Sequence, residues 1–190
     1  MKRVILLGSS GSIGESTCKV ARALPETMKL VGLGVAKSGE RVLAQAREFG
    51  VKAVAVSDLG AAERVKKDLP QGTKFYSGTE GLSRMVEETE ADMVLVAVVG
   101  TAGLAPALAA LRTGKDLAVA SKEILVLAGS AVMGEAEKHQ RQVLPVDSEH
   151  NAIFQCLQGA KSQEVRKIIL TASGGPLRKS SVEELSLIHI

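Results

Sequence analysis

Short, uninterrupted apolar runs recur along this chain and alternate with longer amphipathic stretches. A strand without polar alternation is buried on both faces, which is typical of a parallel sheet covered by helices. The sequence therefore predicts an α/β fold with a doubly wound, Rossmann-like parallel sheet. The predicted strands are 3–7, 29–35, 52–56, 92–99, 116–120 and 142–146, and the predicted helices are 14–24, 40–50, 61–69, 81–89, 104–114 and 122–140. We expect Gly50 to close the second helix and Gly129 to interrupt the last.

After Val146 apolar runs and amphipathic stretches continue to alternate, but they belong to a different part of the chain. We expect residues 1–146 to form the doubly wound domain and 147–190 to form the incomplete beginning of a second domain. The pattern of residues 147–190 predicts a helix over 149–158, a strand over 165–172, a tight turn at 173–176 and a further helix. Ser180 and Glu183 have the spacing of a capping box at the start of that helix. Because the chain stops on the apolar segment "SLIHI", we expect a truncated chain.

Composition excludes several classes of partner. The net charge is +3, no block of like charges occurs and aromatic residues make up 2%, so we expect no nucleic-acid partner. No apolar run approaches the roughly 18 residues that a membrane span needs, so we expect no membrane partner. Cys18 and Cys156 are far apart in sequence and form no disulfide framework. A reducing, cytoplasmic location fits this cysteine usage.

Three glycines, Gly8, Gly11 and Gly14, recur at every third position directly after the first predicted strand. A strand, a glycine turn and a helix N-terminus together form a pyrophosphate-binding geometry. One glycine allows the tight turn, the second lets the backbone approach the phosphates, and the third lets the helix pack close to the strand. The intervening serines would add hydroxyl donors. The alternative is an ordinary glycine-rich turn without a ligand.

The end of the second predicted strand selects the cofactor. Many NAD enzymes place an acidic residue there for the ribose 2′-hydroxyl, whereas this chain has Lys37 and Ser38, with Arg41 beyond them. A cation and a hydroxyl suit a 2′-phosphate, so we predict NADPH rather than NADH. Glu40 favours the opposite preference, and Lys37 as a solvated loop residue is the alternative.

Asp147 and Glu149 follow the sixth predicted strand and are two residues apart, so in an extended chain they point to the same side. Hard carboxylate oxygens suit Mg²⁺ or Mn²⁺, although another ligand is needed to close such a site. The alternative is a helix N-terminus with Asp147 or Ser148 as cap, and the spacing favours neither reading. Lys122, at the tip of the fifth strand, aims at the same crevice or at water.

Two further features are weaker. The turn "TASGGP" carries Ser173 and offers backbone N–H groups to an anion, but taken alone this feature favours a plain turn. Cys18 and Cys156 are interpreted as packing residues and not as nucleophiles.

Four motifs, in this order, resemble the 1-deoxy-D-xylulose 5-phosphate reductoisomerase family from Met1 to about Leu185: "LGSSGSIGEST", "VGTAGLAPALAALRTGKDLAVASKE", "LPVDSEHNAIFQ" and "LTASGGP". The resemblance implies an NADPH-dependent enzyme of non-mevalonate isoprenoid biosynthesis. Such an enzyme converts 1-deoxy-D-xylulose 5-phosphate to 2-C-methyl-D-erythritol 4-phosphate with Mg²⁺ or Mn²⁺. It also implies a small phosphorylated sugar as substrate and a homodimer at full length.

The resemblance assigns roles to matching positions of this chain. The cofactor residues are Gly8, Ser10, Gly11, Ser12, Ile13, Lys37, Ser38, Ser121 and Glu123. The substrate-contacting, catalytic residues are Lys122, Ser148, Glu149 and Ser173, and the metal ligands are Asp147 and Glu149. The family commonly has other residues where Ala36, Ser38 and Ser121 stand, and it continues beyond this chain with a phosphate-binding cluster and a third acidic ligand.

We therefore expect the N-terminal part of this reductoisomerase, inactive by itself. The resemblance implies that 1–146 is its NADPH-binding, Rossmann-like domain and that 147–190 is the incomplete beginning of its catalytic, metal-binding α+β domain. One alternative is an NADPH-binding module without activity. Another is a different NADP-linked oxidoreductase of the doubly wound class, such as a semialdehyde dehydrogenase, whose chemistry needs an activated cysteine in the crevice.

Overall fold

The computed structural model describes residues 1–171, 179–181 and 183–184. The chain divides into two compact units, Met1–Asp147 and Ser148–Ile190. No helix in the described part of the chain combines the length and the apolar character that a membrane crossing requires.

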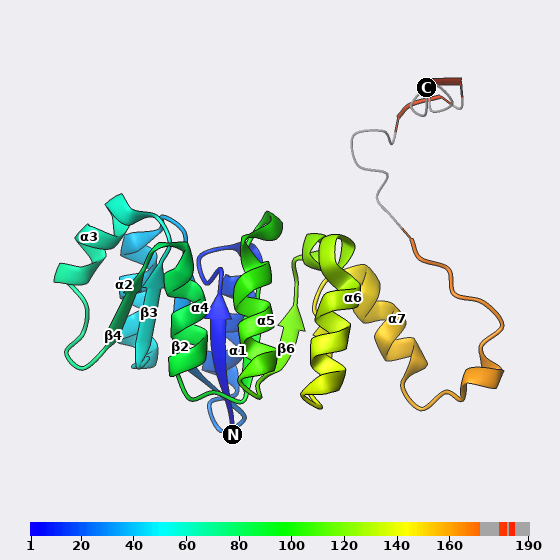
Figure 1. Ribbon diagram of the computed structural model, residues 1–190, viewed down its shortest axis with the longest axis horizontal. Helices are drawn as coiled ribbons and strands as arrows, with labels where there is room; N and C mark the ends of the chain where they lie inside the picture. The colour runs from blue at the N-terminus through cyan, green and yellow to red at the C-terminus, as the bar shows by residue number, and fades with distance from the viewer. Residues whose placement is uncertain (172–178, 182, 185–190) are drawn as a thin grey trace. The chain divides into compact units, whose positions relative to one another are not determined.

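Within the described residues the first unit contains one seven-stranded parallel sheet (Figure 1). Its strands are β1 (Lys2–Leu7), β2 (Met28–Val35), β3 (Ala53–Val56), β4 (Lys74–Ser77), β5 (Met93–Val96), β6 (Asp116–Val119) and β7 (Val143–Pro145). Its helices are α1 (Ser12–Ala23), α2 (Gly39–Phe49), α3 (Leu59–Lys67), α4 (Gly78–Glu88), α5 (Leu104–Arg112) and α6 (Lys122–Lys138), with a 3₁₀ turn, η1, at Gly100–Gly103.

The strand order is β4-β3-β2-β1-β5-β6-β7. The chain starts in the middle of the sheet, runs outward to β4 and then returns to the other side of β1 with β5. This reversal is the topological switch point of a doubly wound fold, and ligands of such sheets bind outside the carboxyl ends of the strands there. The predicted fold class is confirmed.

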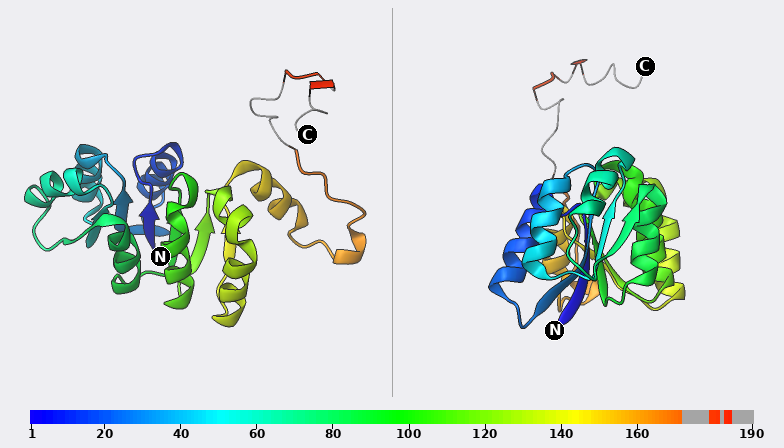
Figure 2. Two further views of the ribbon diagram at one scale, coloured as in Figure 1. Left: turned by 45° about the horizontal axis from the view of Figure 1, so that its top comes forward. Right: turned by 90° about the vertical axis from the view of Figure 1, so that its left-hand side faces the viewer.

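Helices cover both faces of the sheet, as the edge-on view of Figure 2 shows. Val4 and Leu6 of β1 pack with apolar residues of α1, α2 and α3, whereas Ile5 and Leu7 pack with those of α4, α5 and α6. All four side chains are at most 3% exposed, because successive residues of a strand point to opposite faces and both faces are covered. The uninterrupted apolar pattern of the strands follows from this two-sided burial.

Several local predictions are confirmed and others are wrong. Gly50 follows α2 in the left-handed region, at φ 58°, as expected of a glycine that ends a helix. α6 is kinked at Ala128, beside the expected position at Gly129. Strand β4 was not predicted: it is four residues long with polar ends, and it forms because the edge of β3 offers a ladder to Phe75 and Tyr76.

The second unit begins with α7 (Ser148–Leu157), followed by the 3₁₀ turn η2 (Ser162–Glu164). The predicted strand over 165–172 is wrong for 165–171, which form no strand. An apolar run becomes a strand only when a neighbouring strand takes its backbone hydrogen bonds. The capping box lies one residue later than predicted: Ser181 N donates to Glu184 Oε2 at 2.8 Å, and Glu184 N donates to Ser181 Oγ at 3.2 Å.

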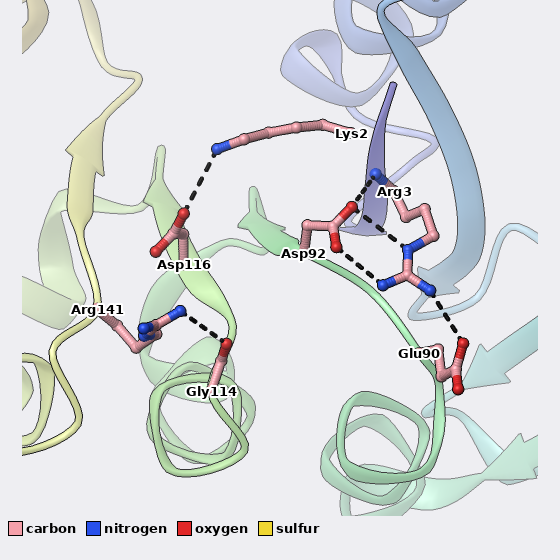
Figure 3. A network of polar contacts seen from close by, with 7 residues as sticks. All are labelled: Lys2, Arg3, Glu90, Asp92, Gly114, Asp116 and Arg141. Atoms are coloured by element: carbon pink, nitrogen blue, oxygen red, sulfur yellow. Dashed lines mark hydrogen bonds and ion pairs between the residues drawn. The ribbon is translucent and has the colours of Figure 1, made fainter.

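Ion pairs join the amino-terminal ends of the strands (Figure 3). The Arg3 guanidinium and backbone N–H both donate to the carboxylate of Asp92, and the same guanidinium reaches Glu90 at 2.9 Å. Lys2 Nζ lies 3.4 Å from Asp116 Oδ2. The Arg3 contacts hold the pKa of Asp92 at about 2, well below its ordinary value. This edge is opposite to the carboxyl ends of the strands, so its charges lie away from the edge at which ligands of such sheets bind.

Candidate functional site

The glycine turn joins β1 to α1 at the switch point of the sheet. Gly8 has a φ of 89°, a conformation that side chains disfavour, and a Cβ there would lie 2.3 Å from the Ala97 carbonyl oxygen. Gly8 N and Ser9 N both donate to the Gly34 carbonyl oxygen of β2, at 2.8 and 3.2 Å. The turn is therefore fixed between the ends of β2 and β5.

Helix α1 starts on the other side of this turn. Gly11 is its N-cap residue and has no side chain with which to cap the helix. The first N–H groups of a helix have no intrahelical acceptor and carry the positive end of its dipole, which favours an anion. A Cβ on Gly14 would lie 2.3 Å from Gly8 O and 2.5 Å from Ser9 O, so only glycine allows this close approach. The geometry matches a phosphate-binding turn.

The serines of the turn differ in their surroundings. Ser9 is fully buried, and its hydroxyl donates to Gln45 Oε1 of α2 at 2.7 Å. The expectation that every serine offers its hydroxyl to a ligand is therefore wrong for Ser9. Ser10 is half-buried and Ser12 is exposed, so both remain near solvent. Sequence reasoning missed Gln45, which lies on the buried face of α2 one turn after Val42.

Lys37 and Ser38 lie directly after β2, as predicted, and Ser38 is the N-cap residue of α2 without a side-chain capping bond. A groove of about 760 Å³ begins at these two residues and continues between α2 and α3. Its cations outnumber its acidic residues, which suits an anionic ligand. The charged lining residues are Lys37, Arg41, Arg64 and Lys67, with Glu40 and Asp68.

After β6 the chain continues through Ser121 into α6. The buried Ser121 hydroxyl donates to the Val98 carbonyl oxygen, which ties this loop to the loop after β5. Lys122 Nζ lies 4.0 Å from Asp147 Oδ1, with side chains that are 49% and 9% exposed. Glu123 is exposed in the first turn of α6. The structure thus brings Lys122 and Asp147 together.

The two predicted metal ligands, Asp147 and Glu149, belong to different units of the chain. Asp147 ends the first unit, and Glu149 lies in the first turn of α7, where it accepts a 2.7 Å hydrogen bond from the Ser148 hydroxyl. Hard oxygen donors suit Mg²⁺ or Mn²⁺. The described residues contain no group of three or more acidic, histidine or cysteine side chains that could hold a metal ion.

Two other predicted features have different outcomes. Ser173 and its turn at 173–176 lie outside the described residues. Cys18 is buried in α1, and burial raises the pKa of its thiol to about 11. Because the thiolate is the nucleophile, this cysteine is inert at neutral pH. The interpretation of Cys156 as a packing residue is wrong, because Cys156 is exposed on α7, a helix without buried residues.

Comparison with protein families gives two matches. Residues 4–129 match the model of 1-deoxy-D-xylulose 5-phosphate reductoisomerase, and residues 143–190 match the model of its C-terminal domain. The chain is 45% identical over 190 residues to the 1-deoxy-D-xylulose 5-phosphate reductoisomerase of Thermoanaerobacter sp. (strain X514). This alignment covers 100% of the chain and 50% of the relative, so the chain spans about half the length of the curated relatives it matches.

Solved structures agree with this result. The reductoisomerase from Zymomonas mobilis in complex with NADPH is 35% identical, with a TM-score of 0.86 over 96% of this chain and 48% of the other. A reductoisomerase in complex with NADPH, fosmidomycin and magnesium is 34% identical, with a TM-score of 0.84 over the same shares.

Proposed function

Because this chain belongs to the 1-deoxy-D-xylulose 5-phosphate reductoisomerase family, we propose that it is part of an enzyme that performs that reaction. The enzyme would rearrange 1-deoxy-D-xylulose 5-phosphate to an aldehyde and reduce the aldehyde with NADPH to 2-C-methyl-D-erythritol 4-phosphate. It would use Mg²⁺ or Mn²⁺ and act in non-mevalonate isoprenoid biosynthesis. Two solved relatives bind NADPH, and one of these also binds magnesium and fosmidomycin.

One observation carries the proposal from the structure. The glycine turn, Lys37, Lys122 and Asp147 follow the carboxyl ends of β1, β2, β6 and β7, four strands of one parallel sheet. Ligands of open α/β sheets bind at that edge. A phosphate-binding turn, two cations and a carboxylate at one edge fit an anionic cofactor with a phosphorylated, metal-bound substrate.

The cofactor would lie along the turn and the start of α2. The N–H groups of Ser10, Ser12 and Ile13 would hold its pyrophosphate. Gly8 would shape the turn, and Gly11, whose N–H donates to Gly8 O, would let the backbone approach the phosphates without a side chain. Lys37 and Ser38 would contact the 2′-phosphate, supported by the cations of the adjacent groove. Ser121 and Glu123 would contact the cofactor from α6. Because the Ser121 hydroxyl already donates to Val98, it can offer a ligand only its acceptor lone pairs.

Substrate and metal would meet the chain after β6 and β7. Lys122, Ser148, Glu149 and Ser173 would contact the substrate, and Asp147 and Glu149 would hold the metal. When bound, NADPH supplies a hydride and the divalent cation supplies a Lewis acid for the substrate oxygens. Lys122 would orient a substrate oxygen while its ammonium group compensates the charge of Asp147.

The proposal also covers the activity of the 190-residue chain by itself and the oligomeric state and location of the full-length protein. We expect the 190-residue chain to bind NADPH without turnover, because its described residues supply too few metal ligands. At full length we expect a cytoplasmic homodimer. Light scattering would test the dimer, and a monomer at full length would contradict this part.

The first test is a titration of this chain with NADPH and with NADH, followed by cofactor fluorescence. Saturable binding with a preference for NADPH would support the cofactor residues. A chain that melts cooperatively and binds neither cofactor would refute them.

The second test restores the missing length. We would join this chain to the second half of the Thermoanaerobacter relative and call the product the extended chain. Loss of NADPH absorbance that depends on 1-deoxy-D-xylulose 5-phosphate and Mg²⁺ is the expected result. A folded extended chain that binds NADPH but consumes none would refute the proposed reaction.

A further inference from the structure

The peptide group between Ser9 and Ser10 is held from α2 by one side chain. Gln45 Nε2 donates to the Ser9 carbonyl oxygen at 3.0 Å, and the Ser9 hydroxyl donates to Gln45 Oε1 at 2.7 Å. Ser9 is fully buried and Gln45 is 5% exposed. The two residues are 36 positions apart in sequence, so this contact exists only in the folded sheet.

The orientation of the Gln45 amide follows from hydrogen-bond chemistry. A carbonyl oxygen only accepts, so the amide nitrogen must face the Ser9 carbonyl, which leaves Oε1 for the hydroxyl. The second amide proton is directed to Glu15 Oε1 of α1, at 3.4 Å. Gln45 thus connects the turn with the first turn of α1. No apolar side chain and no carboxylate could make the same contacts.

This contact determines where the next N–H group points. In a trans peptide the C=O and N–H groups point in opposite directions, and the structure contains no cis peptide among the residues it describes. Because the Ser9 carbonyl faces Gln45, the Ser10 N–H points away from α2. Among the described residues no acceptor takes this N–H. It remains available to a ligand on the open side of the turn.

The following peptide is held in the same way from one helical turn earlier. Arg41 Nη1 donates to the Ser10 carbonyl oxygen at 2.9 Å, and Gly11 N, on the opposite side of that peptide, donates to Gly8 O at 3.0 Å. Arg41 and Gln45 are four residues apart and therefore lie on one face of α2. That helix begins directly after Lys37 and Ser38.

We propose that Gln45 is a positioning residue for the cofactor pyrophosphate: it fixes the Ser9–Ser10 peptide so that the Ser10 N–H faces the phosphates. Arg41 holds the next peptide, whose N–H closes the turn on Gly8 O. This inference rests on the proposed function, because it takes NADPH as the ligand of the turn. It adds that α2 connects the pyrophosphate-binding turn with the loop that contacts the 2′-phosphate.

The test compares two ligands. NADPH carries both a pyrophosphate and a 2′-phosphate, whereas adenosine 2′-monophosphate carries only the latter. Gln45→Met keeps the length of the side chain and removes both hydrogen bonds to Ser9. We expect its NADPH affinity to fall by roughly ten-fold, the loss of about one hydrogen bond to a charged group. Its affinity for adenosine 2′-monophosphate should remain within about two-fold, because this ligand has no pyrophosphate to meet the turn. A merely destabilised fold would instead weaken the binding of both ligands alike.

Ser9→Ala is the matched control. It removes a buried hydroxyl and its bond to Gln45, yet leaves the amide contact with the Ser9 carbonyl in place. We expect a lower melting temperature and an NADPH affinity close to that of the wild type. If Gln45→Met does not melt cooperatively, Gln45→Asn replaces it as the test. Asparagine keeps a polar amide on the buried face of α2 but is one methylene shorter, so its contacts with Ser9 lengthen and a smaller but equally selective NADPH loss is expected.

The outcomes are distinct. Unchanged NADPH affinity in the folded variant, or an equal loss for both ligands, would overturn the positioning role alone. A wild-type chain that melts cooperatively and binds neither ligand would overturn the proposed function, and the positioning role with it.

Discussion

Replacing Gly14 by alanine tests the close approach of α1 to the glycine turn. The added Cβ would lie 2.3 Å from Gly8 O and 2.5 Å from Ser9 C and O. Ordinary contact begins near roughly 3.5 Å, so the helix and the turn must separate by about 1 Å. All three atoms belong to the backbone of a turn that is hydrogen-bonded to Gly34. Rotation of a side chain therefore cannot relieve the contact.

The expected loss can be estimated. Overpacking of this kind costs typically ~1–3 kcal/mol, and a backbone contact belongs at the upper end. Alanine regains about 1 kcal/mol over glycine inside a helix. We therefore expect Gly14→Ala to lower the free energy of unfolding by about 2 kcal/mol. For a chain of this size the melting temperature should fall by about 4–8 °C.

Gly11→Ala is the control for this prediction. At Gly11 the backbone is extended, with φ −82°, and a Cβ would meet only Gly8 O at 3.4 Å. We expect its stability to stay within about 1 kcal/mol of the wild type. NADPH binding should nevertheless weaken, because the new methyl group stands where the backbone meets the phosphates. Thermal melts and NADPH titrations of both variants provide the measurement. A Gly14→Ala chain with wild-type stability and affinity would refute the close-packing argument.

Three further predictions concern charge and thiol chemistry. The lowered pKa of Asp92 contributes stability above its ordinary pKa of 3.8, and this stability is lost as the pH falls toward 2. Since the Asp92 side chain is 37% exposed, Asp92→Asn should lower the free energy of unfolding by about 1 kcal/mol at pH 7 and by nothing below pH 2, as measured by denaturant unfolding. Lys37→Ala should reduce the preference for NADPH over NADH by roughly ten-fold in parallel titrations, and an unchanged ratio would exclude Lys37 from 2′-phosphate recognition. A thiol reagent should modify Cys156 in the native chain and Cys18 only after denaturation, because Cys18 is buried with a raised pKa; rapid modification of both would contradict the described packing.

The sheet could be predicted because its information is local. Six strands carry continuous apolar runs, and each run alone indicates burial on two faces. β4 has no such run: Lys74 and Ser77 are exposed, and its strand conformation depends on the free edge of β3. The segment 165–171 is the opposite case, since its apolar pattern favours a strand and no strand forms. Pairing partners, which a pattern within one segment cannot specify, decided both cases.

The candidate site likewise combines features that a local pattern predicts with features that depend on distant residues. The glycine spacing and the cations after β2 could be found from neighbouring residues. The role of Gln45 could not, because it depends on Ser9, which is far away in sequence and reaches α2 only through the order of the strands. One local signal existed: Gln45 is a polar residue on the apolar face of an amphipathic helix, between Leu43 and Ala46. A polar group in that position must have a buried partner.

Asp147 allows the two readings of the acidic stretch to be separated by experiment. Asp147 directly precedes α7, where Asp and Asn cap a helix about equally well, but only Asp brings a charge to a cation. In the extended chain, the fusion with the second half of the Thermoanaerobacter relative, Mg²⁺ at ten times its Kd should stabilise the protein with Asp147 by about 1.4 kcal/mol. Asp147→Asn should melt like the wild type without metal and lose this stabilisation, whereas Asp147→Ala should also lose about 1 kcal/mol of capping. Thermal melts with and without Mg²⁺ give both quantities. If Asp147→Asn retains the full response to Mg²⁺, Asp147 is a helix cap and not a metal ligand.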